Sequence, residues 1–369
     1  MGAVQTLTVA EDDAGQRLDR WLRRRFPHLA QGAIEKLCRT GQLRLDGARA
    51  KASDRVAAGQ AVRVPPLPDA PPADAARPDR TGAPARAPAA AAASDADAAM
   101  MRAAVIWQDQ HMIVLNKPPG LPSQGGSGQG GRHVDGLSHL LADGYKERPR
   151  LVHRLDKDTS GILLLARTER VARRLAAAFR GREARKVYWA AVAGVPDPKA
   201  GRIRYGLVKA GGHGPGGEGE KMRCVLPDAV ETTEGAQAAT TDYRVISALG
   251  RRVAWVALAP ITGRTHQLRA HMAEIGHPIA GDGKYGGSGQ ENLGDGWGAQ
   301  LGGEISRKLH LHARSLTITH PVTAEVLTFV APLPPHMART WQMMGWREDE
   351  APVDPFAEAP ASAGRGRRR

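Results

Sequence analysis

The sequence predicts an α+β protein with two folded parts. A basic N-terminal stretch has the apolar spacing of two short helices, whereas the chain after residue 104 alternates mainly in the manner of short antiparallel strands. With 369 residues, the chain is long enough for two domains and a sizeable core. We expect a small module over 1–65, a flexible linker over 66–103, a larger domain over 104–345 with a mixed, largely antiparallel sheet flanked by helices, and a disordered tail over 346–369.

The composition is strongly basic. The 52 Lys and Arg residues exceed the 38 Asp and Glu residues, and the formal net charge is +14. This charge favours a polyanionic partner, with nucleic acid the first expectation, although an anionic membrane surface would also respond. Against the membrane, no run of about 18 apolar residues occurs, and residues 6–13 lack the basic start and apolar core of a signal peptide. We therefore expect a cytoplasmic protein.

The two cysteines give no sign of a disulfide framework or a zinc site. Cys38 and Cys224 are far apart and form no Cys-x-x-Cys pair. Cys38 falls at an apolar helix position, where it is best interpreted as a small buried hydrophobic residue. Neither cysteine is expected to take part in chemistry.

The first module reads as two helices followed by strands. Apolar residues at helical spacing predict both helices within 17–39, Gly41 ends the second one, and 43–45 and 61–64 alternate as strands. Twelve Lys and Arg residues in 1–65 face seven acidic residues. Any one of these cations is most simply a solvated surface group, but their clustering favours RNA contact.

The linker is predicted from its composition. Residues 65–99 are rich in Pro and Ala and contain almost no aromatic or β-branched side chains. Such a segment cannot bury enough apolar surface to offset the entropy lost on ordering. We expect a flexible, partly extended tether.

One stretch of the second domain indicates a site. His153-Arg154-Leu155-Asp156 is followed by Thr159-Ser160-Gly161 and then by an apolar run that ends at Ala166. A buried strand would hold the charged residues at a fixed place at its mouth. An ordinary turn, in which Asp and Thr bond nearby amides, explains the same composition, so spacing alone leaves the choice open.

The remaining elements of the domain are predicted from the spacing of apolar residues and from the turn residues between them. We expect strands at 105–107, 113–115, 185–192, 240–246 and 253–258, a helix over 168–179, and a variable hairpin or loop over 201–234. The Gly-rich stretch 125–131 lacks the Gly-Lys-Ser/Thr of a phosphate loop and is predicted to be a mobile loop lining the site. His266 and His271 lie five residues apart, a spacing that disfavours a metal site on one helix face.

The central motif resembles that of the RluA-type pseudouridine synthases, in which its Asp, here Asp156, is catalytic. Lys186-x-Tyr188 is similar to the second motif of that family, and the resemblance implies that Tyr188 stacks on the target base. The block from 261 to 286 resembles the third motif and implies that Arg264 pairs with the catalytic carboxylate. By the same resemblance, Arg154 occupies the space that the extruded base leaves.

The first module is similar to an S4 RNA-binding domain, and the whole chain looks like the RluC type, which acts on large-subunit ribosomal RNA. The RluD type, which also carries an S4 domain, is the near alternative. The module's candidate RNA contacts are Arg17, Arg20, Lys36, Arg39 and Arg44. We expect RNA as the partner, no membrane, no protein partner and a monomeric enzyme.

The implied reaction breaks the N1–C1′ bond of uridine, turns the uracil, joins C5 to C1′ and removes the C5 proton. Because the reaction involves no redox change or external group, neither a cofactor nor a metal is expected. Asp156 is proposed as the nucleophile or as the base that starts elimination at the sugar. Burial alone would raise the pKa of a carboxyl group, so a fixed cation is expected beside it, and Arg264 is the candidate. Tyr188 is proposed to stack on the uracil and to be a candidate acceptor of the C5 proton.

Three other classes of protein share single features of this sequence. A glycosidase needs two carboxylates, but Asp156 and Asp158 are two residues apart and would point opposite ways in an extended segment. An aspartic protease needs a second Asp-Thr/Ser-Gly copy, which the sequence lacks. A non-catalytic RNA-binding or ribosome-assembly protein stays open as the alternative function, although such a protein would have no physical reason to keep Asp156, Tyr188 and Arg264 together.

Overall fold

The structure, a computed structural model, describes residues 4–26, 29, 31–67, 93–125, 132–181, 183–210, 221–286 and 305–357. The chain divides into two compact units, Met1–Ala89 and Ala90–Arg369, each with its own hydrophobic core. Most of the Gly-rich stretch, the middle of the expected linker and the last 12 residues of the expected tail lie outside the described residues. The predicted α+β class is confirmed.

The N-terminal unit packs two helices on a small sheet. Its strands follow the order β1-β4-β2-β3, with bounds β1 Gln5–Thr8, β2 Arg44–Leu45, β3 Ala48–Arg49 and β4 Ala61–Val64. Helices α1 (Leu18–Arg25) and α2 (Gln31–Arg39) follow the predicted pattern, since Leu18, Trp21 and Ile34 are buried in the core. The strand β1 has no counterpart among the predicted elements.

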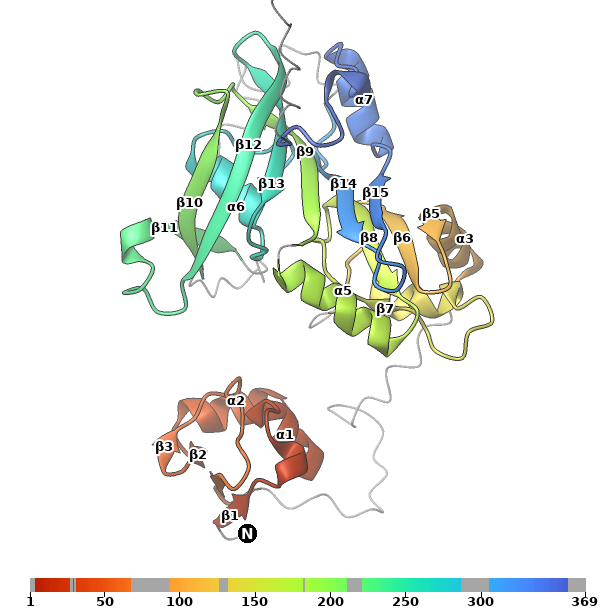
Figure 1. Ribbon diagram of the computed structural model, residues 1–369. Helices are drawn as coiled ribbons and strands as arrows, with labels where there is room; N and C mark the ends of the chain where they lie inside the picture. Colours follow the sequence, from red (N-terminus) through yellow and green to blue (C-terminus); the bar gives the residue numbers. More distant parts are fainter. Residues whose placement is uncertain are drawn as a thin grey trace, which may run out of the picture. The chain divides into compact units, whose positions relative to one another are not determined.

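The C-terminal unit is built on an 11-stranded mixed sheet (Figure 1). The main path is β11-β10-β12-β13-β9-β14-β8-β6-β5, β15 pairs with β14, and β7 pairs with β8. Among its described pairs, only β8 and β14 run parallel. The strands are β5 Val105–Gln108, β6 Met112–Lys117, β7 Arg150–Leu151, β8 Ser160–Ala166, β9 Arg185–Ala193, β10 Ala200–Lys209, β11 Met222–Val225, β12 Gln237–Leu249, β13 Val253–Pro260, β14 Leu311–Thr319 and β15 Val326–Val330.

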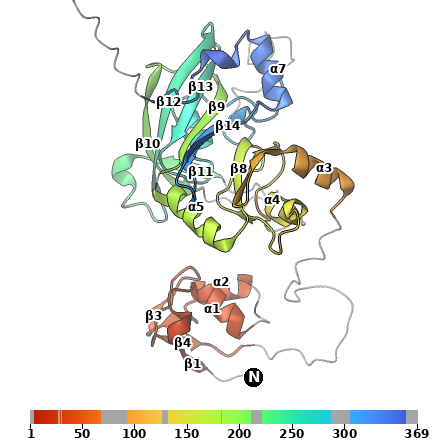
Figure 2. The same ribbon diagram turned by 45° about the vertical axis from the view of Figure 1, so that its right-hand side comes forward.

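Both faces of β8 are covered, which explains its continuous apolar sequence. Ile162 and Leu164 pack with α5 (Glu169–Gly181), while Leu163 and Leu165 pack with α3 (Asp95–Ala103) and α4 (Val134–Leu137), which lie together beside β8 (Figure 2). Gly161 has φ of 108°, and a Cβ there would lie 2.3 Å from the carbonyl oxygen of Ala313. Only glycine therefore permits the close approach of β8 and β14.

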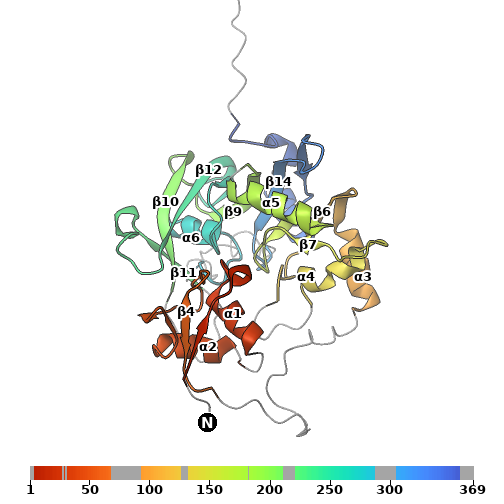
Figure 3. The same cartoon turned by 60° about the horizontal axis from the view of Figure 1, so that its bottom comes forward.

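The β9–β13 part of the sheet is also covered on both faces. Alternate residues of β9 divide between two cores: Trp189 packs with α7 (Pro335–Met343), and Ala190 packs with α6 (Gln267–Glu274). Helix α6 lies against the β10–β12 end of the sheet (Figure 3). Its first residues, together with the loop that precedes β8, line the site described below.

Two expected disordered segments contain ordered structure. Helix α3 begins inside the predicted linker because the side chain of Ser94 accepts a hydrogen bond from the amide of Asp97 and Met101 is buried. Within the predicted tail, Trp346 and Ala351 are buried and Phe356 packs against the same tryptophan-rich core. Apolar packing against α7 thus extends the fold to residue 357.

Among the described residues, no helix is long and apolar enough to cross a membrane.

Candidate active site

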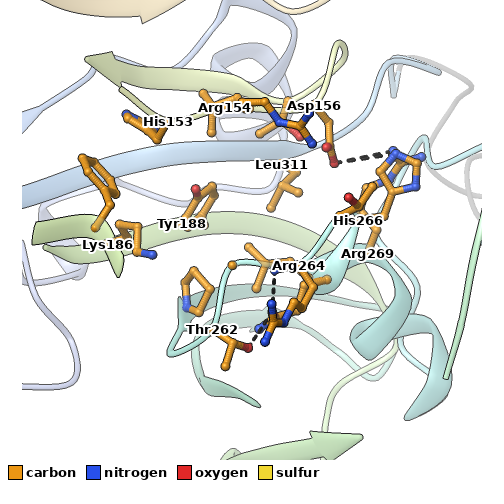
Figure 4. A pocket seen from close by; sticks show the side chains of 18 of the residues that line it. His153, Arg154, Asp156, Lys186, Tyr188, Thr262, Arg264, His266, Arg269 and Leu311 are labelled. Atoms are coloured by element: carbon orange, nitrogen blue, oxygen red, sulfur yellow. Dashed lines mark hydrogen bonds and ion pairs between the residues drawn. The ribbon is translucent and has the colours of Figure 1, made fainter. Parts of the chain in front are cut away.

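A cavity of about 510 Å³ opens at the mouth of β8. One side, the strand wall, consists of residues 152–156 and 159 with side chains from β9 and α5. The other side, the helix wall, consists of residues 260–269, which lead from β13 into α6. This volume lies within the range of sites that enclose a small molecule or one nucleotide. Asp156, Tyr188, Arg154 and Arg264 all line it (Figure 4).

Backbone contacts fix the loop that carries Asp156. The hydroxyl of buried Ser123 donates to the carbonyl oxygen of Leu155 at 2.7 Å and accepts from the amide of Leu155 at 3.0 Å. The amide of Thr159 donates to the carbonyl oxygen of Asp156 and closes the turn. The main chain on both sides of Asp156 is therefore held before any substrate arrives.

Lys117 holds the same loop from behind. Its side chain is fully buried, and its ammonium donates to the carbonyl oxygens of Pro118, Leu121 and Lys157 at 2.8–3.0 Å. Burial lowers the pKa of Lys117 to about 7, although the charges of Asp158 and Asp156 oppose this shift. Three carbonyl acceptors compensate for the desolvation of the ammonium, so the lysine links the end of β6 to the motif loop.

His153 has a structural role in the strand wall. Its Nε2 accepts the amide hydrogen of Leu164 at 3.0 Å, and its ring stacks on Phe179 with centroids 4.2 Å apart. Burial, and then the charge of Lys186, lowers the pKa of His153. A neutral ring is required because a protonated Nε2 could not accept the Leu164 hydrogen.

Tyr188 and Lys186 enter the cavity from β9. They are two residues apart and therefore lie on one face of the strand. Burial, and then the charge of Asp156, raises the pKa of the half-buried Tyr188, so its hydroxyl keeps its proton at neutral pH. Burial lowers the pKa of Lys186, whose ammonium lies 5.9 Å from the Phe179 ring centroid.

The helix wall supplies a buried cation to Asp156. Nη1 of Arg269 lies 3.8 Å from Oδ2 of Asp156. The same guanidinium makes two hydrogen bonds of 2.7 Å to Asp282, which is buried. Such bidentate pairs are geometrically rigid, so Asp282 holds the Arg269 guanidinium beside the Asp156 carboxylate. Burial lowers the pKa of Arg269, but its hydrogen bonds to Asp282 and the charges of Asp282 and Asp156 together outweigh burial and raise the pKa.

The expectation that Arg264 is the cation beside Asp156 is wrong for this structure. Arg264 is exposed, its Nε donates to the carbonyl oxygen of Ala238 at 3.3 Å, and it lies across the cavity from Asp156 (Figure 4). The position next to Asp156 belongs to Arg269, five residues later. The difference arises from the side chain of Gln267, which accepts a hydrogen bond from the amide of Arg264 and donates hydrogen bonds to β12. These bonds fix the turn by which the chain enters α6 between the two arginines.

Arg269 and Asp282 belong to the charged cluster around Asp156 but are not among the site residues that the sequence motifs predicted. A signal was present: Asp282 follows an apolar segment, Pro278 to Gly281, where a carboxylate needs a cationic partner. Gly281 has φ of 73°, and a Cβ there would lie 2.1 Å from the carbonyl oxygen of Lys308. This glycine is therefore required for the tight turn that places Asp282 beside Arg269.

The five candidate RNA contacts of the N-terminal unit are all exposed: Arg17, Arg20, Lys36, Arg39 and Arg44. The charge of Arg17 is partly compensated, because its guanidinium donates two hydrogen bonds to Asp19 at 2.6 and 3.1 Å. Arg44 donates to the carbonyl oxygens of Gly41 and Gly47. Their exposure leaves these cations accessible to a polyanion.

The rival carboxylate arrangement does not form. Asp158 is exposed and is not among the residues that line the cavity, so it does not face Asp156 across a bound sugar. In the part of the chain that the structure describes, no group of three or more His, Cys, Asp and Glu residues is arranged to hold a metal ion.

Comparison with known proteins identifies the class. The family model for RNA pseudouridylate synthase matches residues 111–274, which include Asp156, Tyr188 and Arg269. Ribosomal large subunit pseudouridine synthase C of Vibrio cholerae is 31% identical over 342 residues, which cover 92% of this chain and 97% of that protein. Its counterpart in Escherichia coli is 31% identical over 93% of this chain and 97% of that protein.

A solved structure agrees with the sequence comparison. Human RNA pseudouridylate synthase domain containing 4 is 32% identical, has a TM-score of 0.55, and aligns with 67% of this chain and 95% of its own. The fold and the cavity are thus those of an enzyme that isomerises uridine in RNA to pseudouridine. The chain belongs to the RNA pseudouridine synthase family.

Proposed function

We propose that this enzyme modifies uridines of large-subunit ribosomal RNA and that Asp156 is the reacting carboxylate. The substrate class is supported by the names of the relatives, which match this chain over nearly their full length. The observation that carries the assignment of Asp156 is its place in the cavity, 3.8 Å from the fixed guanidinium of Arg269 and on the same wall as Tyr188. In this proposal Arg269 replaces Arg264 as the partner of the carboxylate.

The chemistry needs one carboxylate in its ionised form. The N1–C1′ bond of uridine breaks and N1 keeps the electron pair, the C5–C1′ bond forms, the C5 proton leaves to solvent, and N1 takes up a proton from solvent. Asp156 either attacks the electrophilic sugar carbon or removes a proton from the sugar to start elimination. Both routes require the charge that Arg269 stabilises, and in both the carboxylate is regenerated when the new C–C bond is complete.

Tyr188 and Arg154 handle the base and the RNA in this proposal. The ring of Tyr188 offers a stacking surface next to Asp156, and base stacking contributes about 1–3 kcal/mol. Because its pKa is raised, the phenol stays protonated, and it can accept the C5 proton only if it gives up its own proton to another group. Arg154 is exposed at the cavity mouth, where it can fill the space of a nucleotide extruded from a helix.

The N-terminal unit would act as an S4-like RNA-binding module. Two short helices on a small sheet present several exposed cations, which include Arg20, Lys36 and Arg39. Contacts to phosphates add affinity in a salt-dependent way and carry no base selectivity of their own. We expect the module to raise the local RNA concentration in a monomeric, cytoplasmic enzyme, while the cavity selects the uridine.

Chemical mapping of pseudouridine across total RNA tests the proposal. Cells that carry the wild-type chain are compared with cells that carry Asp156→Ala, and Asp158→Asn serves as a matched control because that carboxylate lies outside the cavity. We expect specific large-subunit positions to lose pseudouridine only with Asp156→Ala. Loss at transfer RNA or small-subunit positions would contradict the substrate class, and unchanged maps would contradict the role of Asp156.

A further inference from the structure

His266 and Tyr285 form a contact that the reaction scheme above does not use. Nε2 of His266 lies 4.0 Å from Oδ2 of Asp156, and the His266 side chain is 11% exposed. Nδ1 of His266 lies 3.0 Å from the hydroxyl oxygen of Tyr285. The imidazole is thus placed between the reacting carboxylate and a tyrosine outside the cavity lining.

The hydrogen bonds of the Tyr285 hydroxyl determine the tautomer of His266. The Tyr285 oxygen accepts the amide hydrogen of Met222 at 2.8 Å. Its own proton needs an acceptor, and among the described contacts of this hydroxyl the acceptor is Nδ1 of His266. Nδ1 must then lack a hydrogen, so the neutral imidazole carries its proton on Nε2, which faces Asp156.

The titration behaviour of both groups is consistent with this arrangement. Burial raises the pKa of Tyr285 to about 12, so the phenol keeps the proton that it donates. Burial lowers the pKa of His266, an effect that Asp156 and Asp282 oppose and that Arg269 and Lys284 reinforce. Burial, the largest of these effects, favours a neutral imidazole with one N–H.

The backbone of His266 is held in an unusual conformation. Its φ is 51°, in the left-handed region that side-chain-bearing residues rarely adopt. The following residue fixes it, because the side chain of Gln267 bonds Thr262 and the amide of Arg264. A constrained backbone at the edge of a cavity points to a side chain whose direction matters.

Tyr285 also contacts the other group that faces Asp156. The guanidinium carbon of Arg269 lies 5.2 Å from the centroid of the Tyr285 ring. A single tyrosine thus braces Arg269 with its ring and His266 with its hydroxyl. Arg269 supplies charge that is already shared with Asp282, whereas His266 supplies a directional N–H.

We propose that Tyr285 is a positioning residue that, through its hydroxyl, fixes His266 as an Nε2–H donor directed at the Asp156 carboxylate. The proposal rests on the proposed role of Asp156. The donor orients the carboxylate toward the ribose without neutralising it, and the proposal requires the 4.0 Å separation to shorten to hydrogen-bond length when the nucleotide is bound. His266 thus raises the rate of the chemical step without affecting which uridine is selected.

Nitrogen NMR of the full chain labelled with ¹⁵N-histidine tests the tautomer directly, and His266→Gln assigns the signals. We expect a protonated Nε2 and a bare Nδ1 in the wild type, and a mixture of tautomers in Tyr285→Phe. Tyr243→Phe is the matched control, because its hydroxyl donates to Pro198 away from the cavity. A protonated Nδ1 in the wild type, or an unchanged tautomer in Tyr285→Phe, would overturn the proposal.

Steady-state kinetics tests the consequence. For Tyr285→Phe we expect a roughly tenfold lower kcat with KM changed by no more than about twofold, as for the loss of one hydrogen bond. His266→Leu should lose about thirtyfold to a hundredfold, and His266→Gln, which offers an amide N–H, should recover part of it. Equal rates for Gln and Leu at position 266 would contradict a donor role. The NMR result does not depend on activity, so it stands or fails separately from the assignment of Asp156.

Discussion

The two walls of the cavity position their charged groups by different means. The strand wall holds Asp156 through its main chain, because Ser123 and Lys117 bond to backbone groups of the loop. The helix wall holds Arg269 through a side-chain ion pair with Asp282. The position of a loop that is held by its backbone can be predicted from a contiguous motif. The direction of a side chain that is held by a distant partner can be read only from the folded structure. The four predictions below test this difference, from the largest expected effect to the smallest.

Removing the cation of the helix wall should affect the rate most. Arg269→Met deletes the guanidinium 3.8 Å from Asp156, and we expect kcat to fall by about 10²–10³-fold, as for one electrostatic group in a site shielded from water. Arg264→Met is the matched control from the same wall and should lose less than about tenfold. Steady-state rates on a ribosomal RNA fragment measure both. A larger loss in Arg264→Met would reverse the assignment.

Breaking the support of Arg269 should lower stability. Asp282→Asn leaves a buried guanidinium without its bidentate partner, and we expect the free energy of unfolding to fall by about 3–5 kcal/mol. Asp242→Asn breaks the exposed pair with Arg202 and should cost no more than about 1 kcal/mol. Urea unfolding measures both changes. Similar costs for the two variants would show that burial does not distinguish these pairs.

Acid should weaken the support of the strand wall through His312. Its side chain is fully buried, its Nδ1 lies 2.9 Å from the hydroxyl of Ser160 at the start of β8, and burial lowers its pKa to about 3. A histidine kept neutral by the fold contributes stability above its unfolded pKa, near 6.5, and loses it as the pH falls toward the folded pKa.

We therefore expect His312 to cost up to about 1.4 kcal/mol per pH unit below pH 6.5. In His312→Asn, urea unfolding between pH 7.5 and pH 5 should show lower stability at neutral pH and a shallower decline than the wild type. An equal slope in both proteins would mean that this histidine does not titrate on unfolding.

Loosening the backbone of the strand wall should have the smallest effect on the rate. Ser123→Ala removes both bonds to Leu155, but the three bonds from Lys117 remain. We expect a loss of about 1–3 kcal/mol in stability and a fall of less than about tenfold in kcat. Ser138→Ala, which removes a buried serine bond to Asp135, controls for the packing change. A rate loss as large as that of Arg269→Met would contradict the redundancy of this wall.

The sequence predicted most elements whose signal is local. Apolar spacing and turn residues predicted the strand β8, the helix α5 and the β12–β13 pair. Helix α3 was missed because its Ala-rich sequence resembles a linker, and its formation depends on the Ser94 cap and the burial of Met101. The ordered start of the tail was missed because Trp346 becomes apolar core only beside α7.

The same distinction applies to the site. Asp156 and Tyr188 were identified from contiguous motifs, and the fold brings both to one cavity. Arg264 and Arg269 lie in one motif, and nothing in their spacing tells which of them reaches Asp156. That choice depends on the side-chain bonds of Gln267 to β12 and on Asp282, which are contacts between segments far apart in the sequence.

Release of the C5 proton tests the role of Asp156 most directly. Ribosomal RNA with tritium at C5 of uridine is incubated with excess purified wild-type chain, Asp156→Asn or Asp158→Asn, and tritium in water is counted over time. Because the C5 hydrogen leaves only when C5 bonds to C1′, we predict release by the wild type and Asp158→Asn and none above background by folded Asp156→Asn. Release by Asp156→Asn at a rate near that of the wild type would contradict the account and place the reacting carboxylate elsewhere.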